Sequence, residues 1–375
     1  MTAHAIQLTR TLVQIPTINP PGNELAAAQH LGAVLEDAGF STELVAMGEG
    51  RANLVARIGG VSDTPPLAFT GHIDVVPLGA AAWSMDPFGA ETADGKLYGR
   101  GSSDMKSGVA AFVAAAVELA PRLAHSPGLL LVITAGEETG CEGAVHLART
   151  RPELLDRAGA LIVAEPSSNR PLVGHKGALW LKALSLGVTA HGSMPDKGDN
   201  AVYKAARAVG RLESFDFNVA RHPVMGPPTL NVGWLHGGMN INSVPDRAEI
   251  GIDIRTIPGL AHDRLVEALA SLLRDEASID RLLDVEGIWT APDHPWVEDV
   301  FAAVKDITGQ PAEVAAASYF TDASALAPAL GGPPTIVLGP GPAHMAHQTD
   351  EYCELDRIDE ARAIFSRLIA GWCGL

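Results

Sequence analysis

Acidic and histidine side chains are spread along this sequence in types and spacings that could bind metal ions. They comprise His72, Asp74, Asp104, Glu137, Glu138, Glu165 and His347. Imidazole nitrogens and carboxylate oxygens are ligands that zinc and related divalent cations accept. Each residue alone also has an ordinary structural explanation, such as a capping acid or a surface charge near a helix start. The prediction of a metal site therefore depends on a fold that brings them together.

Asp104 is the residue on which this prediction depends most. It follows the glycine-containing segment 98–103 and precedes an apolar run over 107–120. That run is apolar nearly all round, which predicts a helix buried on every side. A loop of this kind places one carboxylate at the start of a buried helix. We expect Asp104 to bridge two divalent metal ions.

Two short motifs supply further candidate ligands. In the motif His72-x-Asp74, alternate side chains of an extended segment point to the same side. His72 could then bind a metal while Asp74 holds the other ring nitrogen. The adjacent Glu137 and Glu138 point in different directions, so one can bind a metal while its neighbour acts on water.

Two more candidates close the set. Glu165 ends an apolar run, and a charge at the end of a buried strand needs a partner. His347 lies on a glycine- and proline-rich loop over 339–348, where His344 is a rival ligand. The residues alone leave the choice between these two histidines open.

The elements that must position these residues alternate between strand-like and helix-like patterns. Apolar runs over 66–70, 129–134 and 160–164 are typical of strands covered on both faces, and helical spacing separates them. This alternation predicts an α/β fold with a mostly parallel, doubly wound sheet, which binds ligands beyond the carboxyl ends of its strands. The side chains at such strand ends are His72, Asp74, Glu137, Glu138 and Glu165.

The expected order of strands and helices changes after residue 176. The expected order over 177–289 is strand, helix, strand, strand, helix, strand, which is that of a ferredoxin-like domain. The alternating pattern then returns, with a helix over 296–308, strands over 312–318 and 334–338, and a closing helix over 357–372. A chain of 375 residues is also long for one hydrophobic core. We predict a catalytic domain of residues 1–176 and 290–375, with an inserted dimerisation or lid domain at 177–289.

The bulk composition excludes several classes of partner. A net charge of -17 disfavours nucleic acid and anionic membranes, because both would repel the protein. The three cysteines, Cys141, Cys353 and Cys373, are widely spaced and form no disulfide framework. No apolar signal segment opens the sequence, and no uninterrupted apolar run of about 18 residues occurs in it. A cytoplasmic enzyme fits these features best.

Phosphate-binding, dinucleotide-binding, single-helix zinc and nucleophile-elbow motifs are absent from the sequence. What the sequence does contain resembles the di-zinc amidohydrolase and peptidase family, along essentially its whole length. That family includes acetylornithine deacetylase, succinyl-diaminopimelate desuccinylase, aminoacylase and carboxypeptidase G. The resemblance is carried by the ordered motifs His72-x-Asp74, Gly-Ser-Ser-Asp104-Met-Lys, Glu137-Glu138, Glu165-Pro and Ala-His347.

This resemblance implies a site with two metal ions. One ion would be held by His72, Asp104 and Glu165, and the other by Asp104, Glu138 and His347. The Gln-Thr-Asp-Glu sequence that follows His347 is similar to that after the family's ligand histidine, which favours His347 over His344. The resemblance implies zinc, although mixed imidazole and carboxylate ligands also suit cobalt or manganese. Glu137 matches the general base of the family, and Asp74 matches the residue that orients His72. A cis peptide between Asp104 and Met105 is also expected.

The resemblance extends to residues of the inserted domain. His191 is similar to a histidine that reaches from the other subunit to stabilise the oxyanion, which implies a homodimer. Asn242 and Arg255 match substrate-contacting positions, and an arginine can grip a carboxylate with two hydrogen bonds. The simpler explanations are a loop histidine, a turn asparagine and a surface ion pair.

The function that these expectations favour is metal-dependent hydrolysis of an N-acyl amino acid, of the acetylornithine deacetylase or succinyl-diaminopimelate desuccinylase kind. A bridging water activated by Glu137 would attack the amide. The alternative on the same fold is a dipeptidase or a glutamate-releasing carboxypeptidase, acting on a short peptide. A binding protein without catalysis is disfavoured by the intact Glu137. A two-metal phosphoesterase is disfavoured because no basic cluster flanks the ligands.

Overall fold

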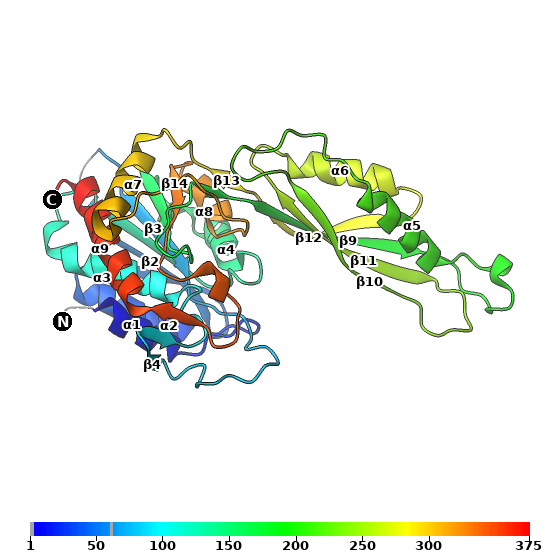
Figure 1. Ribbon diagram of the computed structural model, residues 1–375, viewed down its shortest axis with the longest axis horizontal. Coiled ribbons are helices and arrows are strands. Elements are labelled where there is room, and N and C mark those ends of the chain that lie inside the picture. Colours follow the sequence, from blue (N-terminus) through cyan, green and yellow to red (C-terminus); the bar gives the residue numbers. More distant parts are fainter. Residues whose placement is uncertain (1–3, 61–62) are drawn as a thin grey trace. The chain divides into compact units, whose positions relative to one another are not determined.

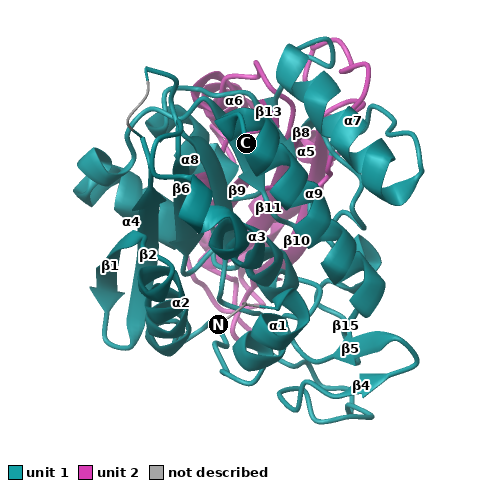
Figure 2. Cartoon of the chain, turned by 90° about the vertical axis from the view of Figure 1, so that its left-hand side faces the viewer, with its two compact units in different colours: residues 1–174, 289–316, 321–375 teal, residues 175–288, 317–320 magenta. Residues whose placement is uncertain are grey.

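The computed structural model describes residues 4–60 and 63–375. The chain forms two compact units (Figure 2), of which unit 1 comprises 1–174, 289–316 and 321–375, and unit 2 comprises 175–288 and 317–320. The two main crossings lie close to those expected from the sequence, at 176/177 and 289/290. The short return of the chain into unit 2 at 317–320 was not expected.

Unit 1 is built on a six-stranded sheet in the order β1-β2-β6-β3-β7-β14. Strands β6, β3, β7 and β14 run parallel to one another, whereas β2 is antiparallel to β6 and pairs antiparallel with β1 at the edge. The prediction of a mostly parallel α/β sheet is confirmed. The strands are β1 (Ser41–Gly48), β2 (Arg51–Ile58), β3 (Leu67–His72), β6 (Leu129–Thr134), β7 (Ala160–Val163) and β14 (Thr335–Val337).

Helices cover both faces of this sheet, with α1, α3, α7 and α9 on one side and α4 and α8 on the other (Figure 1). Helix α3 packs against β3, α1 and α9, which explains why its sequence is apolar nearly all round. The helices are α1 (Ala5–Val13), α2 (Leu25–Asp37), α3 (Lys106–Leu119), α4 (Glu142–Thr150), α7 (Pro295–Thr308), α8 (Ala323–Ala329) and α9 (Leu355–Cys373). None of the helices within the described ranges is long and apolar enough to cross a membrane.

Smaller elements complete unit 1. One is a three-stranded sheet in the order β15-β5-β4. Strands β4 and β5 directly precede the Asp104 loop in the chain, and β15 directly follows the His347 loop. The strands of this sheet and the short 3-10 helices of the chain are β4 (Thr92–Ala93), β5 (Lys96–Tyr98), β15 (Tyr352–Glu354), η1 (Ala120–Arg122), η2 (Pro152–Leu154), η3 (Pro195–Lys197) and η4 (Ala343–Met345).

Unit 2 is a four-stranded antiparallel sheet in the order β10-β11-β9-β12, with two helices packed on one face. The sequence order and this strand order together are those of a ferredoxin-like fold. Its elements are β9 (Gly177–Leu186), α5 (Ala201–Glu213), β10 (Thr229–Gly237), β11 (Arg247–Thr256), α6 (His262–Leu273) and β12 (Ser278–Val285). The crossings between the units fall within β8 (Gly174–His175) and β13 (Ile288–Trp289).

One expected strand is wrong. The segment 312–318 forms no strand and makes a single bridge, between Ala317 and His175. Its backbone accepts hydrogen bonds from the amides of Val173, at Ala315, and Lys176, at Ala317, both in one stretch of the chain. Two such hydrogen bonds and one bridge fall short of the regular ladder of a strand.

Gly108 shows how closely α3 approaches the parallel sheet. A Cβ atom at this position would lie 2.0 Å from the backbone oxygen of Ala164, just beyond β7. Backbone cannot move aside as a flexible side chain can. We therefore expect Gly108→Ala to destabilise unit 1 by about 1–3 kcal/mol or more, measured as a lower midpoint of urea unfolding.

The matched control is Gly371→Ala in α9, where a Cβ meets nothing within 4 Å. That variant should be as stable as the parent or up to about 1 kcal/mol more stable, because alanine favours the helix. Equal midpoints for the two variants would contradict the close packing of α3 inferred here.

Candidate metal centre

The first group of candidate ligands gathers at the carboxyl end of β3. His72 is the last residue of that strand, and its Nε2 atom lies 3.2 Å from Oδ1 of Asp104 and 3.8 Å from Oε1 of Glu165. One ligand atom from each of these residues lies within 4.8 Å of the others. The strands β3, β6 and β7 are parallel neighbours, so their carboxyl ends meet at the same edge of the sheet.

A second group of ligands shares Asp104 with the first. The Nε2 atom of His347 lies 3.0 Å from Oε2 of Glu138 and 3.5 Å from Oδ2 of Asp104. The two oxygens of Asp104 thus face different histidines, His72 through Oδ1 and His347 through Oδ2. His344, the rival ligand, instead has its ring against Tyr352, with the ring centres 6.4 Å apart.

The composition of the two groups suits a pair of divalent cations. Burial raises the pKa of Glu165 well above its usual value, and the charges of Asp104 and Glu138 raise it further. The Oε1 atom of Glu138 is buried and has no hydrogen-bond partner among the described residues. Buried carboxylates this close together are costly unless cations compensate them. The donor set of histidine nitrogens and carboxylate oxygens fits zinc and similar ions.

Asp74 connects the His72-x-Asp74 motif to the Glu137-Glu138 motif. Its Oδ1 lies 3.4 Å from Nδ1 of His72, and its carboxylate accepts hydrogen bonds from the backbone amides of Glu137, at 3.1 Å, and Glu138, at 3.3 Å. Burial opposes the charged form of Asp74, but its hydrogen bonds and the charge of His72 outweigh burial and lower the pKa of this carboxyl. Asp74 thus orients a candidate ligand, whose Nδ1 atom also lies 2.9 Å from the carbonyl oxygen of Asp74, and the turn that carries Glu137.

Glu137 lies beside the two groups without belonging to either. Its side chain is buried, and burial raises its pKa well above the usual value, opposed by the charge of His72 and reinforced by Glu165 and Glu138. A carboxylate held next to a metal site in this way is positioned to exchange a proton with water.

The loop that carries Asp104 is held firmly. The peptide between Asp104 and Met105 is cis, as expected. Met105 is buried, and its sulfur accepts a hydrogen bond from the amide of His72. Lys106 is buried too, and it donates to the carbonyls of Leu12 and Ile15; burial lowers its pKa to about 7.

The remaining predicted residues lie in unit 2. The loops of His191 and Asn242 run side by side, because the amide of Gly192 donates to the carbonyl of Asn242 and His191 forms a bridge with Ser243. The ring of His191 is exposed, with its Nδ1 atom 2.8 Å from the hydroxyl of Ser193.

Arg255 stands elsewhere in unit 2, on β11. Its Nε atom lies 3.0 Å from Oδ1 of Asp253, which also accepts a hydrogen bond from the indole of Trp180 at 2.9 Å. The guanidinium is half-buried and is held in a fixed direction by this neighbour.

Two supporting residues escaped sequence reasoning. Asn19 donates to Oδ2 of Asp74 at 2.9 Å, from a segment 55 residues earlier in the chain. Glu351 accepts hydrogen bonds from the Asp104 loop across 247 residues. Neither contact has a local spacing that would predict it, although Glu351 ends the Gln-Thr-Asp-Glu sequence that singled out His347.

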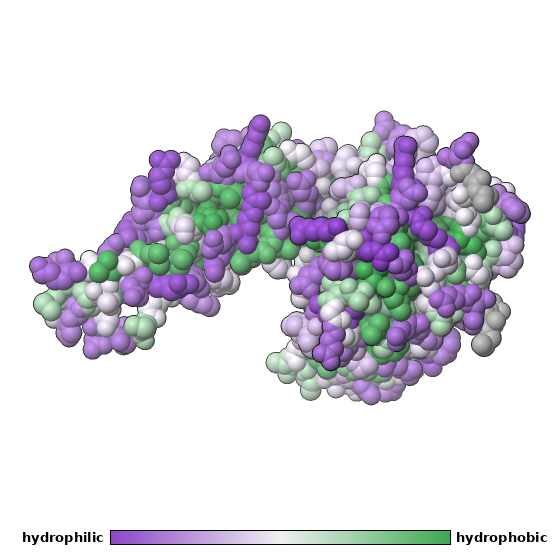
Figure 3. Space-filling model, turned by 180° about the vertical axis from the view of Figure 1, so that it is seen from behind, coloured by the Kyte–Doolittle hydropathy of each residue, from purple (hydrophilic) through white to green (hydrophobic). Residues whose placement is uncertain are grey.

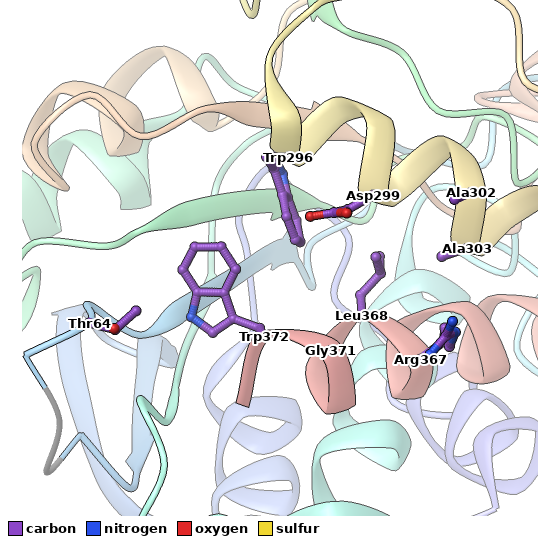
Figure 4. Close-up of a pocket in the computed structure, with 9 residues that line it drawn as sticks. All are labelled: Thr64, Trp296, Asp299, Ala302, Ala303, Arg367, Leu368, Gly371 and Trp372. Carbon is purple, nitrogen blue, oxygen red and sulfur yellow. The ribbon is translucent and has the colours of Figure 1, made fainter. Parts of the chain in front are cut away.

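A separate hollow lies on another face of unit 1, between α7 and α9 (Figure 4). It has a volume of about 370 Å³ and contains the edge-on pair of Trp296 and Trp372, with Asp299 and Arg367 near its rim. It shares no residue with the metal groups, so its size does not mark the site of chemistry.

A parallel sheet whose strand ends gather two histidine and carboxylate groups around one shared aspartate defines a metal-dependent hydrolase. Residues 68–371 match the model of Peptidase family M20/M25/M40, and the chain belongs to this family of hydrolytic metalloenzymes.

Relatives and solved structures agree with this assignment. The chain is 31% identical to a protein of Photorhabdus laumondii named acetylornithine deacetylase, over 98% of this chain and 97% of the relative. It is 30% identical to a probable succinyl-diaminopimelate desuccinylase of Staphylococcus aureus, over 96% and 97%. The structure of an M20 family metallo-carboxypeptidase from Sulfolobus solfataricus matches with a TM-score of 0.83 at 18% identity, covering 99% of this chain and all of that chain, which shows the shared fold.

Proposed function

We propose that this enzyme hydrolyses the amide bond of an N-acyl amino acid, as a deacylase of the acetylornithine deacetylase or succinyl-diaminopimelate desuccinylase kind. The observation that carries the proposal is the pair of ligand groups sharing Asp104, with the buried Glu137 beside them. The deacylase branch is favoured because relatives with these names align over nearly the whole chain.

In this proposal His72, Asp104 and Glu165 hold one metal ion, and Asp104, Glu138 and His347 hold the other. Zinc is the ion we propose, with cobalt or manganese as substitutes that the same donors accept. When bound, a pair of such cations polarises the scissile carbonyl and makes water a better nucleophile at neutral pH.

Glu137 is the proposed general base. Its carboxylate accepts a proton from the water that attacks the amide carbon and returns that proton to the departing amine nitrogen. Asp74 supports this role, because its hydrogen bond to the amide of Glu137 fixes the turn from which the base projects. Burial keeps bulk water from competing for the proton.

Arg255 and Asn242 are proposed to contact the substrate. Asp253 accepts from Arg255 and leaves the rest of the guanidinium fork for a carboxylate of the substrate. An N-acyl amino acid carries such a carboxylate beside its amide. The specificity for one acyl group or side chain would then depend on the neighbours of Arg255.

We further propose that the enzyme is a homodimer formed through unit 2. Strand β10 is an edge strand of its sheet, and apolar side chains on it and on the following loop are exposed. The most exposed are Met239, at 83%, and Ile241, at 105%. Uncovered edge strands and apolar patches are typical of pairing surfaces. In such a dimer, His191 of one subunit would stabilise the oxyanion in the site of the other. The loop that carries His191 runs beside the loop of Asn242 in the same subunit.

The cytoplasm is the proposed location. The three cysteines are free and buried, as expected of a protein that folds under reducing conditions.

The substrate class is tested by incubating the zinc-loaded enzyme with matched sets of N-acyl amino acids and dipeptides and measuring products by mass spectrometry. We expect release of acetate or succinate, because relatives named as deacylases align nearly end to end. Release of free amino acids from dipeptides, or of glutamate from peptides that end in it, with no release of acetate or succinate from the N-acyl amino acids, would instead support the dipeptidase or carboxypeptidase alternative.

The role of Glu137 is tested by Glu137→Gln. This variant should keep two bound metals, since Glu137 belongs to neither ligand group, while kcat falls by about 10²–10⁴. Metal content by mass spectrometry and steady-state kinetics measure the two effects. Glu142→Gln, a nearby exposed glutamate that pairs with Arg51, is the matched control and should keep its activity. Full turnover by Glu137→Gln would refute its role as base.

The role of His191 is tested by subunit mixing. His191→Ala alone should lose about 10²–10³ in kcat, the usual effect of one oxyanion donor. Mixed with Asp104→Ala, it should regain partial activity, because a hybrid dimer would contain one site with both parts intact. If subunit exchange is demonstrated and activity does not return, the contribution across the dimer is ruled out.

A further inference from the structure

Glu351 is a fully buried carboxylate that faces the loop carrying Asp104. Its Oε1 atom accepts hydrogen bonds from the backbone amides of Ser103, at 2.8 Å, and Asp104, at 3.0 Å. Its Oε2 atom accepts from the amide of Gly101, at 3.0 Å, and from Nη1 of Arg100, at 2.6 Å. One carboxylate thus satisfies four donors of a single short loop.

The loop is built to present those amides. Gly101 has φ of 85°, a conformation that favours glycine, and a Cβ there would lie 2.6 Å from Val75. Ser103 and Gly101 are buried, so their amides have no water to replace a lost acceptor. A buried amide without a partner costs about 1–3 kcal/mol, and the loop would rearrange to avoid that cost.

Arg100 extends the connection to the segment of the second histidine. Its side chain is 2% exposed and donates through Nη1 to the carbonyl of Gln348, at 3.2 Å, and through Nη2 to that of Pro77, at 3.2 Å. Gln348 directly follows His347 in the chain. The pair of Glu351 and Arg100 therefore links the backbone of the Asp104 loop to the segment that carries His347.

We propose that Glu351, together with Arg100, is a positioning residue of the metal centre: it sets the Asp104 loop and the His347 segment at the separation that metal binding requires. The proposal rests on the ligand groups of the proposed function, and on none of its statements about substrate. It follows from the geometry because Asp104 belongs to both ligand groups, so a shift of its loop moves one ligand of each. Groups that orient metal ligands typically change metal affinity by about 10- to 100-fold when altered.

Glu351→Gln is the variant that tests this role, since the side chain keeps its size. An amide has one acceptor oxygen, and its NH2 group would face either the Ser103 and Asp104 amides or the Gly101 amide and Arg100, all of which are donors. Zinc binding to the metal-free enzyme is measured by calorimetry with a competing chelator, without any substrate. We expect zinc affinity to fall by about 10- to 100-fold. The visible spectrum of the Co²⁺-loaded variant should also change, because Co²⁺ absorption reports ligand geometry.

The matched control is Glu276→Gln in unit 2. Glu276 is likewise a buried carboxylate held by arginines, Arg207 and Arg211, and it belongs with them to unit 2, whereas the Asp104 loop belongs to unit 1. It should bind zinc and Co²⁺ as the parent does, at whatever cost in thermal stability. If Glu351→Gln unfolds, the double variant Arg100→Gln and Glu351→Gln leaves no buried charge unpaired and should show the same loss of affinity.

Parent-like zinc affinity in folded Glu351→Gln, or an equal loss in Glu276→Gln, would overturn the positioning role. Asp104→Ala separates the two proposals. If Asp104→Ala still binds two ions, the ligand groups themselves are wrong and both proposals fail. If it loses them while Glu351→Gln binds both with full affinity, only the positioning role fails.

Discussion

The structure depends on how negative charge is distributed at one edge of a buried sheet. Carboxylates that serve as scaffolding are saturated by backbone amides, as Asp74 is by the amides of Glu137 and Glu138 and Glu351 is by those of the Asp104 loop. Carboxylates that face the site are left short of donors, as the unpartnered Oε1 atom of Glu138 shows among the described residues. A buried carboxylate without hydrogen-bond donors is costly in free energy. The site where such carboxylates gather therefore favours the binding of cations.

The fold makes this distribution possible through parallel strands. His72 pairs in register with Thr134, so the strand that carries the first histidine and the strand that leads to Glu137 end at the same level. Helix α3 must then begin close to that level to deliver Asp104, and Gly108 allows its close approach to the backbone beyond β7. The level at which His72 and Asp104 meet therefore depends on backbone packing.

The same reasoning explains which features the sequence predicts. Apolar runs such as 129–134 predict strands, and the acidic residues that follow them predict the edge of the sheet where ligands gather. Both patterns can be read from neighbouring residues of the sequence. Asn19 and Glu351 escape such reasoning, since each acts on a partner far away in the chain and neither stands in a periodic pattern. The segment 312–318 misleads for another reason: its composition suits a strand, but its backbone makes a single bridge, between Ala317 and His175.

The division of the chain into units also separates the candidate metal ligands from the residues that are proposed to contact the substrate. All candidate metal ligands lie in unit 1, whereas His191, Asn242 and Arg255 lie in unit 2. Within unit 2, the direction of Arg255 is set by Asp253, which also binds the indole of Trp180. Substitutions at Asp253 or Trp180 can therefore redirect the guanidinium without disturbing any metal ligand of unit 1. In a chain about 30% identical to its relatives, the hydrolytic centre can persist while the substrate changes, because different packing interactions hold the two.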